Sequence, residues 1–209
     1  MRAMIMGALL VLALTVTTAA AEDIALNGGA EEAVDGVPAH WMLYGSGSRA
    51  TIGQADAGYA GKCAFIEVKS FTPSADEDRK GEDYINVGLV QGDSNGFIGT
   101  DAYIHQPPDE ARFFRTGVPT RYTVSWWMRG DAGPVNVGIK TWSTEEATAD
   151  SRGGAGLLGK TMSTDEWTHY TASATVAGDV KRLCIQFQVY GFREDGVRLG
   201  TVYVDEVTI

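Results

Sequence analysis

Short segments in which apolar and polar residues alternate recur along the chain, and no stretch after Ala21 keeps the three-to-four-residue spacing of an amphipathic helix. Alternation over four to eight residues is typical of β-strands that bury one face. The pattern predicts seven strands, at 62–68, 84–90, 122–129, 135–142, 167–175, 182–190 and 201–209, and two weaker ones at 41–44 and 102–105.

Polar, Gly-rich or Pro-containing segments separate these strands and are predicted to be loops. The main ones are 70–82, 92–99, 106–119 and 143–159. Many short strands without a strand-helix-strand rhythm favour two antiparallel sheets packed face to face. We therefore expect an all-β fold, a two-sheet antiparallel jelly-roll sandwich, in a single domain over residues 22–209.

The alternation also assigns side chains to the two faces of each strand. In the strand at 182–190 the core side carries Leu183, Ile185, Phe187 and Val189, and the other side carries Cys184, Gln186, Gln188 and Tyr190. By the same phase, Trp127 and Trp142 fall on the outward sides of the strands at 122–129 and 135–142. We expect Trp127, Trp142, Gln186 and Gln188 to share one water-facing surface.

The first 21 residues have the layout of a secretory signal peptide. Arg2 precedes an uncharged run, and the small residues Ala19, Ala20 and Ala21 form a cleavage site, so we expect processing after Ala21 and export to the extracellular or periplasmic space. The alternative is an N-terminal membrane anchor, but the apolar run is shorter than the ~20 residues that span a bilayer.

The chain is acidic, with 17 Lys and Arg residues against 27 Asp and Glu residues and a net charge of −10. This charge argues against nucleic acid or an anionic membrane as partner, and it leaves carboxylates for a cation such as calcium. The two cysteines, Cys63 and Cys184, form either one disulfide or two separate thiols in neighbouring strands, and the sequence leaves both possibilities open.

Six short motifs occur in an order that resembles the carbohydrate-binding modules of families 4, 9 and 22. They are N-G-G-A-E at 27–31, V-P-A-H-W at 37–41, Y-A-G-K-C-A-F at 59–65, R-Y-T-V-S-W-W-M-R at 121–129, E-W-T-H-Y at 166–170 and V-Y-V-D-E-V at 202–207. Two features depart from the family: Ala30 stands where an aromatic residue is usual, and the stretch 92–115 is longer than expected. The resemblance implies a galactose-binding-domain-like β-sandwich that binds polysaccharide or oligosaccharide, beside a catalytic domain or a separate carbohydrate-active enzyme.

The resemblance also implies a structural calcium ion. The matching ligands are the carboxylates of Glu31 and Asp205 and the backbone carbonyl of Lys62, and oxygen ligands of this kind suit calcium. The alternative is that Glu31 and Asp205 are solvated carboxylates of a turn and a strand end.

Sugar recognition needs flat apolar rings together with planar groups that hydrogen-bond hydroxyls. The candidates are the rings of Trp127 and Trp142, the amides of Gln186 and Gln188, and Tyr190 and Arg193 at the rim. Alternatively, one tryptophan is buried under the predicted loop 143–159, and the glutamines are ordinary polar residues on the solvent-exposed face of a sheet.

Two other function classes remain open. A glycoside hydrolase would need two facing carboxyl groups, from Glu82, Asp83, Asp101, Glu145 or Glu146, and a lyase would need a base such as Tyr103 or His105. The carboxylates lie in or beside predicted loops, and the segment 103–106 is equally well a strand edge before Pro107 and Pro108. No catalytic motif accompanies these residues, so a non-catalytic binder is favoured. The third class is a structural or adhesion domain of an envelope or matrix, which would not need exposed tryptophans on its sheet.

Overall fold

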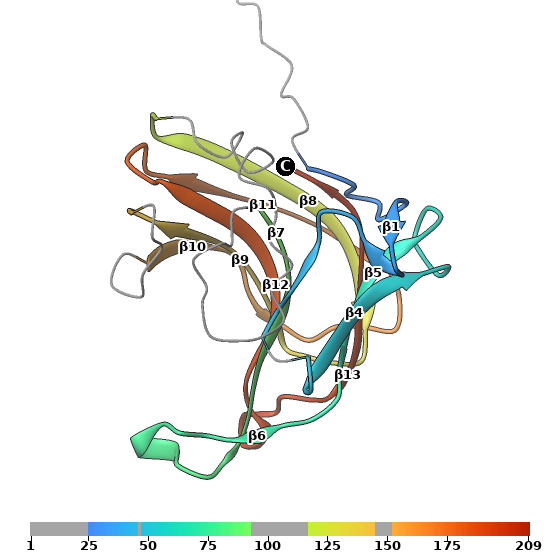
Figure 1. Cartoon of the computed structure of the whole chain (residues 1–209), viewed down its shortest axis with the longest axis vertical. Helices are drawn as coiled ribbons and strands as arrows, with labels where there is room; N and C mark the ends of the chain where they lie inside the picture. The colour runs from blue at the N-terminus through green and yellow to red at the C-terminus, as the bar shows by residue number, and fades with distance from the viewer. Residues whose placement is uncertain (1–24, 46, 93–116, 145–151) are drawn as a thin grey trace, which may run out of the picture.

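The computed structural model describes residues 25–45, 47–92, 117–144 and 152–209, and it forms two curved antiparallel sheets packed face to face (Figure 1). The predicted signal peptide, the weak strand at 102–105 and the long 92–115 stretch beyond Gly92 lie outside these residues. The expected all-β sandwich is confirmed. No helix in the described part of the chain is long and apolar enough to cross a membrane.

The first sheet, called sheet I, has the strand order β10-β9-β12-β7-β3, and β6 pairs with β7 at one end. Its strands are β3 (Met42–Tyr44), β6 (Thr72–Pro73), β7 (Asp83–Gly92), β9 (Val135–Trp142), β10 (Arg152–Thr161) and β12 (Arg182–Phe192).

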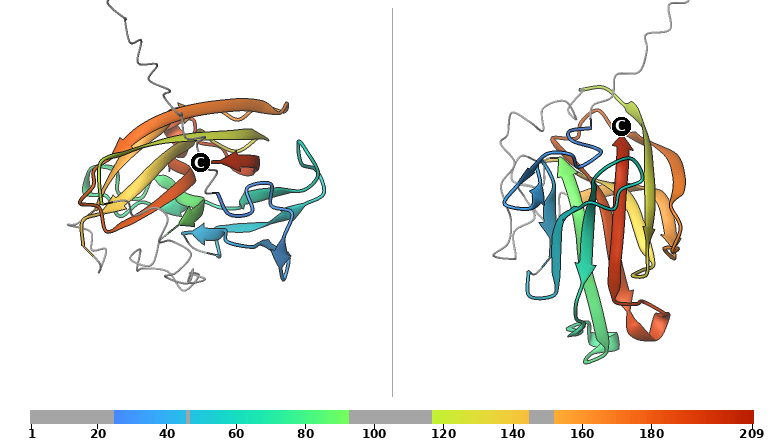
Figure 2. Two further views of the ribbon diagram at one scale, coloured as in Figure 1. Left: turned by 90° about the horizontal axis from the view of Figure 1, so that it is seen from above. Right: turned by 90° about the vertical axis from the view of Figure 1, so that its right-hand side faces the viewer.

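The second sheet, called sheet II, has the order β11-β8-β13-β5-β4. Its strands are β4 (Ala50–Ala55), β5 (Cys63–Val68), β8 (Thr120–Gly130), β11 (Thr168–Val176) and β13 (Gly200–Thr208). The strands β8 and β9 follow each other in the chain but lie in different sheets, as Figure 2 shows from two further sides.

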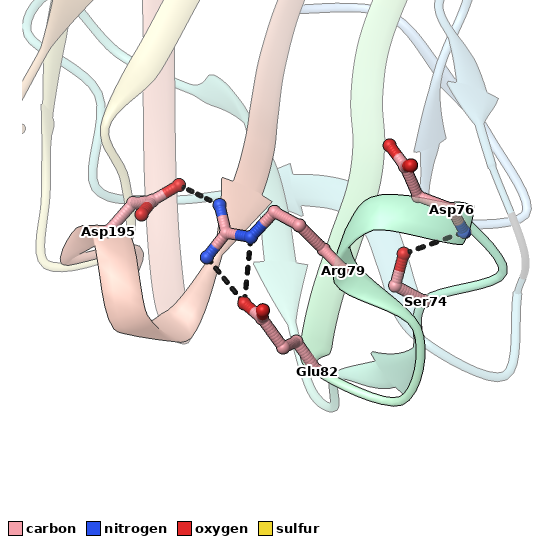
Figure 3. A network of polar contacts seen from close by, with 5 residues as sticks. All are labelled: Ser74, Asp76, Arg79, Glu82 and Asp195. Atoms are coloured by element: carbon pink, nitrogen blue, oxygen red, sulfur yellow. Dashed lines mark hydrogen bonds and ion pairs between the residues drawn. The ribbon is translucent and has the colours of Figure 1, made fainter.

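The smaller elements lie at the edges of the sandwich. They are a hairpin of β1 (Ala33–Val34) and β2 (Val37–Pro38), and two 3₁₀ turns, η1 (Glu77–Arg79) and η3 (Arg193–Asp195). Arg79 joins the two turns, because its guanidinium contacts Glu82 and, at 2.5 Å, Asp195 (Figure 3). Asp76 caps η1 by accepting a hydrogen bond from the Asp78 N–H.

The core between the sheets is built from the inward faces that alternation predicts. Trp126 of β8 meets Phe187 of β12 edge to face, with ring centroids 5.8 Å apart, and both side chains are buried. The indole of Trp126 also stacks on Tyr170 of β11. Burial of these large rings supplies much of the hydrophobic stabilisation that holds the two sheets together.

All seven strongly predicted strands, and the weaker one at 41–44, are confirmed to within two residues at either end. The predicted loop 143–159 is wrong in part, because β10 begins at Arg152 and pairs with β9. Its sequence, R-G-G-A-G-L-L-G-K-T, is rich in glycine and lacks the alternation of apolar and polar residues that predicts a strand. One of those glycines has a steric reason, since a Cβ on Gly154 would lie 2.7 Å from the carbonyl oxygen of Ile139.

The two ends of the domain meet beside sheet II. The Val207 N–H of β13 donates to the Gly28 carbonyl, 3.1 Å away, so the segment before β1 runs along the end of the last strand (Figure 1). The register of β13 against β8 shifts between Asp205 and Thr208, and Glu206 has a positive φ of 48°. This bulge turns Asp205 and Glu206 toward the N-terminal segment.

Candidate functional site

A chain of side-chain amides crosses the outward side of sheet I. The Gln186 Nε2–H donates to Gln188 Oε1 at 2.8 Å, and the Gln188 Nε2–H donates to Asn86 Oδ1 on the neighbouring strand β7. The Asn86 Nδ2–H in turn donates to the Tyr44 hydroxyl of β3 at 3.4 Å. We call Asn86, Gln186 and Gln188 the amide row. Because each amide orients the next, the row presents donors and acceptors in fixed directions.

Gln186 and Gln188 do not lie on a solvent-exposed surface, where the sequence predicts them to be. Gln186 is 3% exposed and Gln188 is 5% exposed. The expected phase is right, because both point away from Leu183, Ile185 and Phe187 in the core, but the outward side of β12 is itself enclosed at this point. Burial of amides requires hydrogen-bond partners, which the row provides.

An aromatic pair stands at one end of the amide row. Tyr190 is 38% exposed, and its ring meets Tyr84 of β7 edge to face at 5.9 Å. The Lys160 ammonium of β10 lies 5.0 Å from the centre of the Tyr190 ring. Burial raises the pKa of the Tyr84 hydroxyl, and the neighbouring Tyr190 adds to the shift, so the Tyr84 phenol stays a protonated hydrogen-bond donor at neutral pH.

Arg193 lies in η3, directly beyond the end of β12. Its guanidinium forms an ion pair with Asp83 at 2.7 Å and lies 4.8 Å from the centre of the Phe71 ring. These contacts hold Arg193 near the Tyr84 end of the sheet. Asp83 is thereby an ion-pair partner, and Glu82 is the partner of Arg79. The other carboxylates and bases considered for catalysis, from Asp101 to Glu146, lie outside the described residues.

Trp142 does not stand on an open surface. It is 1% exposed and packs against Cys184, so the expected exposed indole is wrong. It lies at the end of β9, in register with Arg152 of β10 and Arg182 of β12. The alternative in which one tryptophan is buried therefore holds for Trp142.

Trp127 belongs to sheet II and not to the sheet of the glutamines. It lies on β8, which pairs with β11 and β13, whereas Trp142 lies on β9 of sheet I. The expected grouping of the two tryptophans is therefore wrong. In addition, Tyr59 stacks on Trp127 with centroids 3.7 Å apart and planes 11° from parallel, so the exposed ring of this stack is that of Tyr59, at 49%.

The three residues predicted to hold calcium lie close together, but Lys62 contacts Glu31 through its N–H group and not through its carbonyl. Lys62 donates its backbone N–H to Glu31 Oε1 at 2.9 Å, and Ala60 of the same loop donates to Asp205 Oδ2 at 3.0 Å. Asp205 is completely buried. Burial raises the pKa of its carboxyl, and the nearby charge of Glu31 raises it further, while hydrogen bonds from backbone N–H groups oppose the shift.

Glu206 adds a third carboxyl group beside this loop. A Cβ placed on Gly29 would lie 3.2 Å from Glu206 Oε1 and 3.8 Å from Asp205 Oδ1. Burial raises the pKa of Glu206, and Asp205 and Glu31 add to the shift. Among the described residues no three His, Cys, Asp or Glu side chains are arranged as a complete metal site, so a cation here would need backbone oxygens as well.

The cysteines do not form a disulfide. Cys63 lies on β5 of sheet II and Cys184 on β12 of sheet I, and both thiols are buried. Neither the bridge nor the placement in neighbouring strands is correct, because the two strands belong to different layers. Burial, followed by the charge of Asp205, raises the pKa of Cys63 to about 11.

Three candidate residues, Tyr59, Tyr84 and Asn86, are missing from the set that the sequence predicts, although two of them carry a signal in the sequence. Tyr84 and Asn86 were detectable, since they alternate with the core residues Ile85 and Val87 on a predicted strand. Tyr59 had no such signal, because it lies in a loop that reaches Trp127 only through the fold.

Comparison with known proteins identifies the fold of the chain but not its ligand or its activity. No family model matches the sequence, and no curated protein matches it. The tandem family 22 carbohydrate-binding modules of Paenibacillus barcinonensis Xyn10C superpose with a TM-score of 0.54 at 14% identity, over 93% of this chain and 50% of that one.

Two single modules give similar values. The CBM22-1 xylan-binding domain of the same Paenibacillus protein has a TM-score of 0.52 at 11% identity, over 90% of this chain and 92% of that one. The C-terminal family 22 module of Clostridium thermocellum Xyn10B has a TM-score of 0.52 at 12% identity, over 87% and 89%. The resemblance seen in the short motifs is thus confirmed at the level of the fold, which this chain shares with the family 22 carbohydrate-binding modules.

Proposed function

We propose that this chain is a secreted, non-catalytic carbohydrate-binding module that holds a polysaccharide or oligosaccharide on the outward side of sheet I. The observation that carries the proposal is the amide row, which runs from Gln186 through Gln188 to Asn86 and has the exposed ring of Tyr190 at its end.

The chemistry of this surface suits a polyhydroxyl ligand. A sugar hydroxyl both donates and accepts, and so does the amide of Asn86, which is partly exposed and is held in place by the buried Gln188. The ring of Tyr190 offers a flat apolar face for the C–H side of a pyranose, and Tyr84 and Lys160 fix that ring from two directions. Arg193 lies at the rim, while Trp142 supports the sheet from a buried position and Trp127 has no part in this surface.

The comparisons support the same ligand class. Two of the matched structures are xylan-binding domains or modules with a ligand-binding cleft, by their own descriptions. The net charge of −10 suits a neutral polymer better than an acidic one. A neutral β-linked polysaccharide such as xylan is therefore the first ligand to test, and a separate carbohydrate-active enzyme is the partner that such a module would serve.

Affinity electrophoresis in gels that contain soluble xylan or other neutral polysaccharides tests the proposal. Tyr190→Ala should reduce retardation by the equivalent of about 1–3 kcal/mol, because a stacking ring is lost. Gln188→Ala should also weaken binding, because it breaks the amide row in its middle. Val34→Ala, an exposed apolar residue of the β1–β2 hairpin, serves as control and should bind like the parent chain.

Equal retardation of all three variants and the parent would refute the site. A parallel assay for newly released reducing ends separates a binder from a glycoside hydrolase or lyase. Retardation by no polysaccharide would favour the structural or adhesion class.

We further propose a structural calcium ion held by Glu31, Asp205 and the Lys62 carbonyl. The fit rests on charge: Asp205 is fully buried and lies near Glu31 and Glu206, and each carboxyl disfavours ionisation of its neighbour. A divalent cation would offset this repulsion and hold the two ends of the domain together.

Export remains part of the proposal on the basis of the first 21 residues. Cleavage after Ala21 would give a mature chain that begins at Glu22. Sequencing the N-terminus of the exported protein tests this, and retention of Met1 in the exported chain would exclude it.

A further inference from the structure

We propose a second saccharide site on the outward side of sheet II, in the layer opposite the amide row. Its centre is a pocket of about 370 Å³ at the end of β8 and the start of β13, which we call the outer pocket. It is lined by Arg129, Gly130, Asp131, Asp165, Thr201 and Tyr203. A pocket of this size falls in the range of small-molecule sites and accommodates a pyranose unit.

The donor of the outer pocket is a fixed guanidinium. Arg129 donates from Nη2 to the Ala57 carbonyl at 3.1 Å, and its Cζ lies 5.1 Å from the Trp167 ring centre and 5.0 Å from that of Tyr203. The Nε–H group is buried and has no hydrogen-bond partner among the described residues. An unpartnered buried donor of this kind is uncommon, and it leaves the Arg129 guanidinium with hydrogen-bonding capacity that the described residues do not use.

The acceptors are two carboxylates from different loops. Asp131 is fixed because its Oδ1 accepts the Thr201 N–H at 2.7 Å. Gly200 makes room for it, since a Cβ at that position would lie 2.3 Å from Asp131 Oδ1. Asp165 comes from the turn before β11 and is exposed. Arg129 and Asp131 are thus held in place before any ligand arrives, which lowers the entropic cost of binding.

This combination selects a neutral saccharide over other ligands. Each sugar hydroxyl can donate to Asp131 or Asp165 and accept from Arg129. Two carboxylates against one guanidinium leave the pocket negative, which disfavours phosphate, sulfate and nucleic acid. Flat surface is also present, in Tyr203 inside the pocket and in the Trp167 ring beside Arg129.

The aromatic surface continues beyond the pocket along β8. Trp127, two residues before Arg129, carries the stacked ring of Tyr59 and contacts His169 with ring centroids 4.9 Å apart. Tyr59 also meets Trp167 edge to face at 6.4 Å. The exposed Tyr59 ring therefore extends the platform, so that a chain of several sugar units has contacts outside the pocket.

Indole N–H signals in an NMR titration with xylohexaose, repeated with other neutral oligosaccharides, test the proposal. The five tryptophans report on separate places: Trp127 and Trp167 on the outward side of sheet II, Trp142 on that of sheet I, and Trp41 and Trp126 in the core. We expect Trp127 and Trp167 to shift in a saturable way. Arg129→Lys and Asp165→Asn should each raise the dissociation constant from this titration by about tenfold, because the first removes the planar guanidinium donors and the second removes the charge of an acceptor.

Asp179→Asn, an exposed acidic residue between β11 and β12, is the matched control and should leave the titration unchanged. Shifts at Trp142 and the glutamine amides without shifts at Trp127 and Trp167 would overturn the second site and leave the proposed function standing. Shifts only at Trp127 and Trp167 would support the second site and refute the first. No shift with any oligosaccharide would overturn both. An equal loss in Asp179→Asn would also overturn the second site, because binding would then depend on net charge and not on the outer pocket.

Discussion

At the scale of single residues, burial and charge conflict most strongly at Asp205. The carboxyl is completely enclosed, accepts backbone N–H groups from Ala60 and Glu206, and lies within reach of the charges of Glu31 and Glu206. Desolvation and like charge both raise the pKa of a carboxyl group. The ionised form of Asp205 therefore costs stability unless a cation or a hydrogen bond offsets the charge.

This conflict gives a pH-dependent prediction. The folded pKa values of Asp205 and Glu206 lie above their unfolded values, so the stability they contribute is complete below about pH 4 and is lost as the pH rises through the folded pKa values. In a chelator, Glu206→Gln should therefore unfold at a higher temperature than the parent chain at neutral pH, and at a similar temperature in acid.

Calcium should act over the same pH range. Added calcium is expected to raise the melting temperature of the parent chain at neutral pH and to have little effect in acid, because protons then compete for the carboxyl groups. Thermal melts with calcium and with chelator, at both pH values, measure this. Glu194→Gln, an exposed residue of η3, is the control. A parent chain whose melt ignores calcium at neutral pH would remove the metal from the proposal.

At the scale of elements, the last strand β13 depends on the segment that precedes β1. Gly28 approaches β13 so closely that a Cβ would lie 1.9 Å from the Val207 carbonyl oxygen, while its own carbonyl accepts the Val207 N–H. The backbone atoms of Val207 cannot move away from an added Cβ as the end of a flexible side chain could. The contact between the two ends of the domain therefore requires glycine at this position.

Gly28→Ala is expected to destabilise the domain by about 1–3 kcal/mol, because the added methyl group separates the N-terminal segment from β13. Gly156→Ala on β10 is the control, since a Cβ there meets nothing within 4 Å. Chemical denaturation of both variants measures the difference. Equal unfolding midpoints for the two variants would show that the docking of the N-terminal segment adds little to stability.

At the scale of the whole molecule, the arrangement in two sheets separates the thiols of Cys63 and Cys184, for which the sequence allows a disulfide or neighbouring strands. Cys63 and Cys184 lie in different sheets, and the pKa of Cys63 is raised to about 11 mainly by burial. The thiolate is the reactive form, so a buried thiol with this pKa reacts slowly at neutral pH. An oxidising compartment would then leave the folded chain without its one conceivable internal disulfide.

Thiol labelling checks this directly. In a Cys184→Ser background, Cys63 should react with a thiol reagent at neutral pH only as fast as the protein opens, and completely once the chain is unfolded in denaturant. The labelling rate should increase as the free energy of unfolding decreases, so it should be higher in Gly28→Ala than in the parent background. Rapid labelling of the native protein, or a mass that shows a disulfide in the parent chain, would contradict the placement of the two cysteines.

The local pattern determined a large part of this fold. Alternation located eight strands and the inward faces of β8, β9 and β12, because a strand that buries one face must repeat every two residues. It also placed Gln186, Gln188 and Tyr190 on one side of β12, and the short motifs brought Glu31, Lys62 and Asp205 to one expected place. Each of these depends on the residues of one strand or on the order of motifs along the chain.

The pairing of strands was decided only by the tertiary structure. Trp127 and Trp142 have the same phase in consecutive strands, yet β8 and β9 enter different sheets, so the two indoles lie in different layers. Likewise, the glycine-rich segment of β10 forms a strand because it pairs with β9, and Tyr59 reaches Trp127 from a loop. A period of two residues gives the face of a strand but not its neighbour, because the partner lies far away in sequence and is selected by packing of the whole domain.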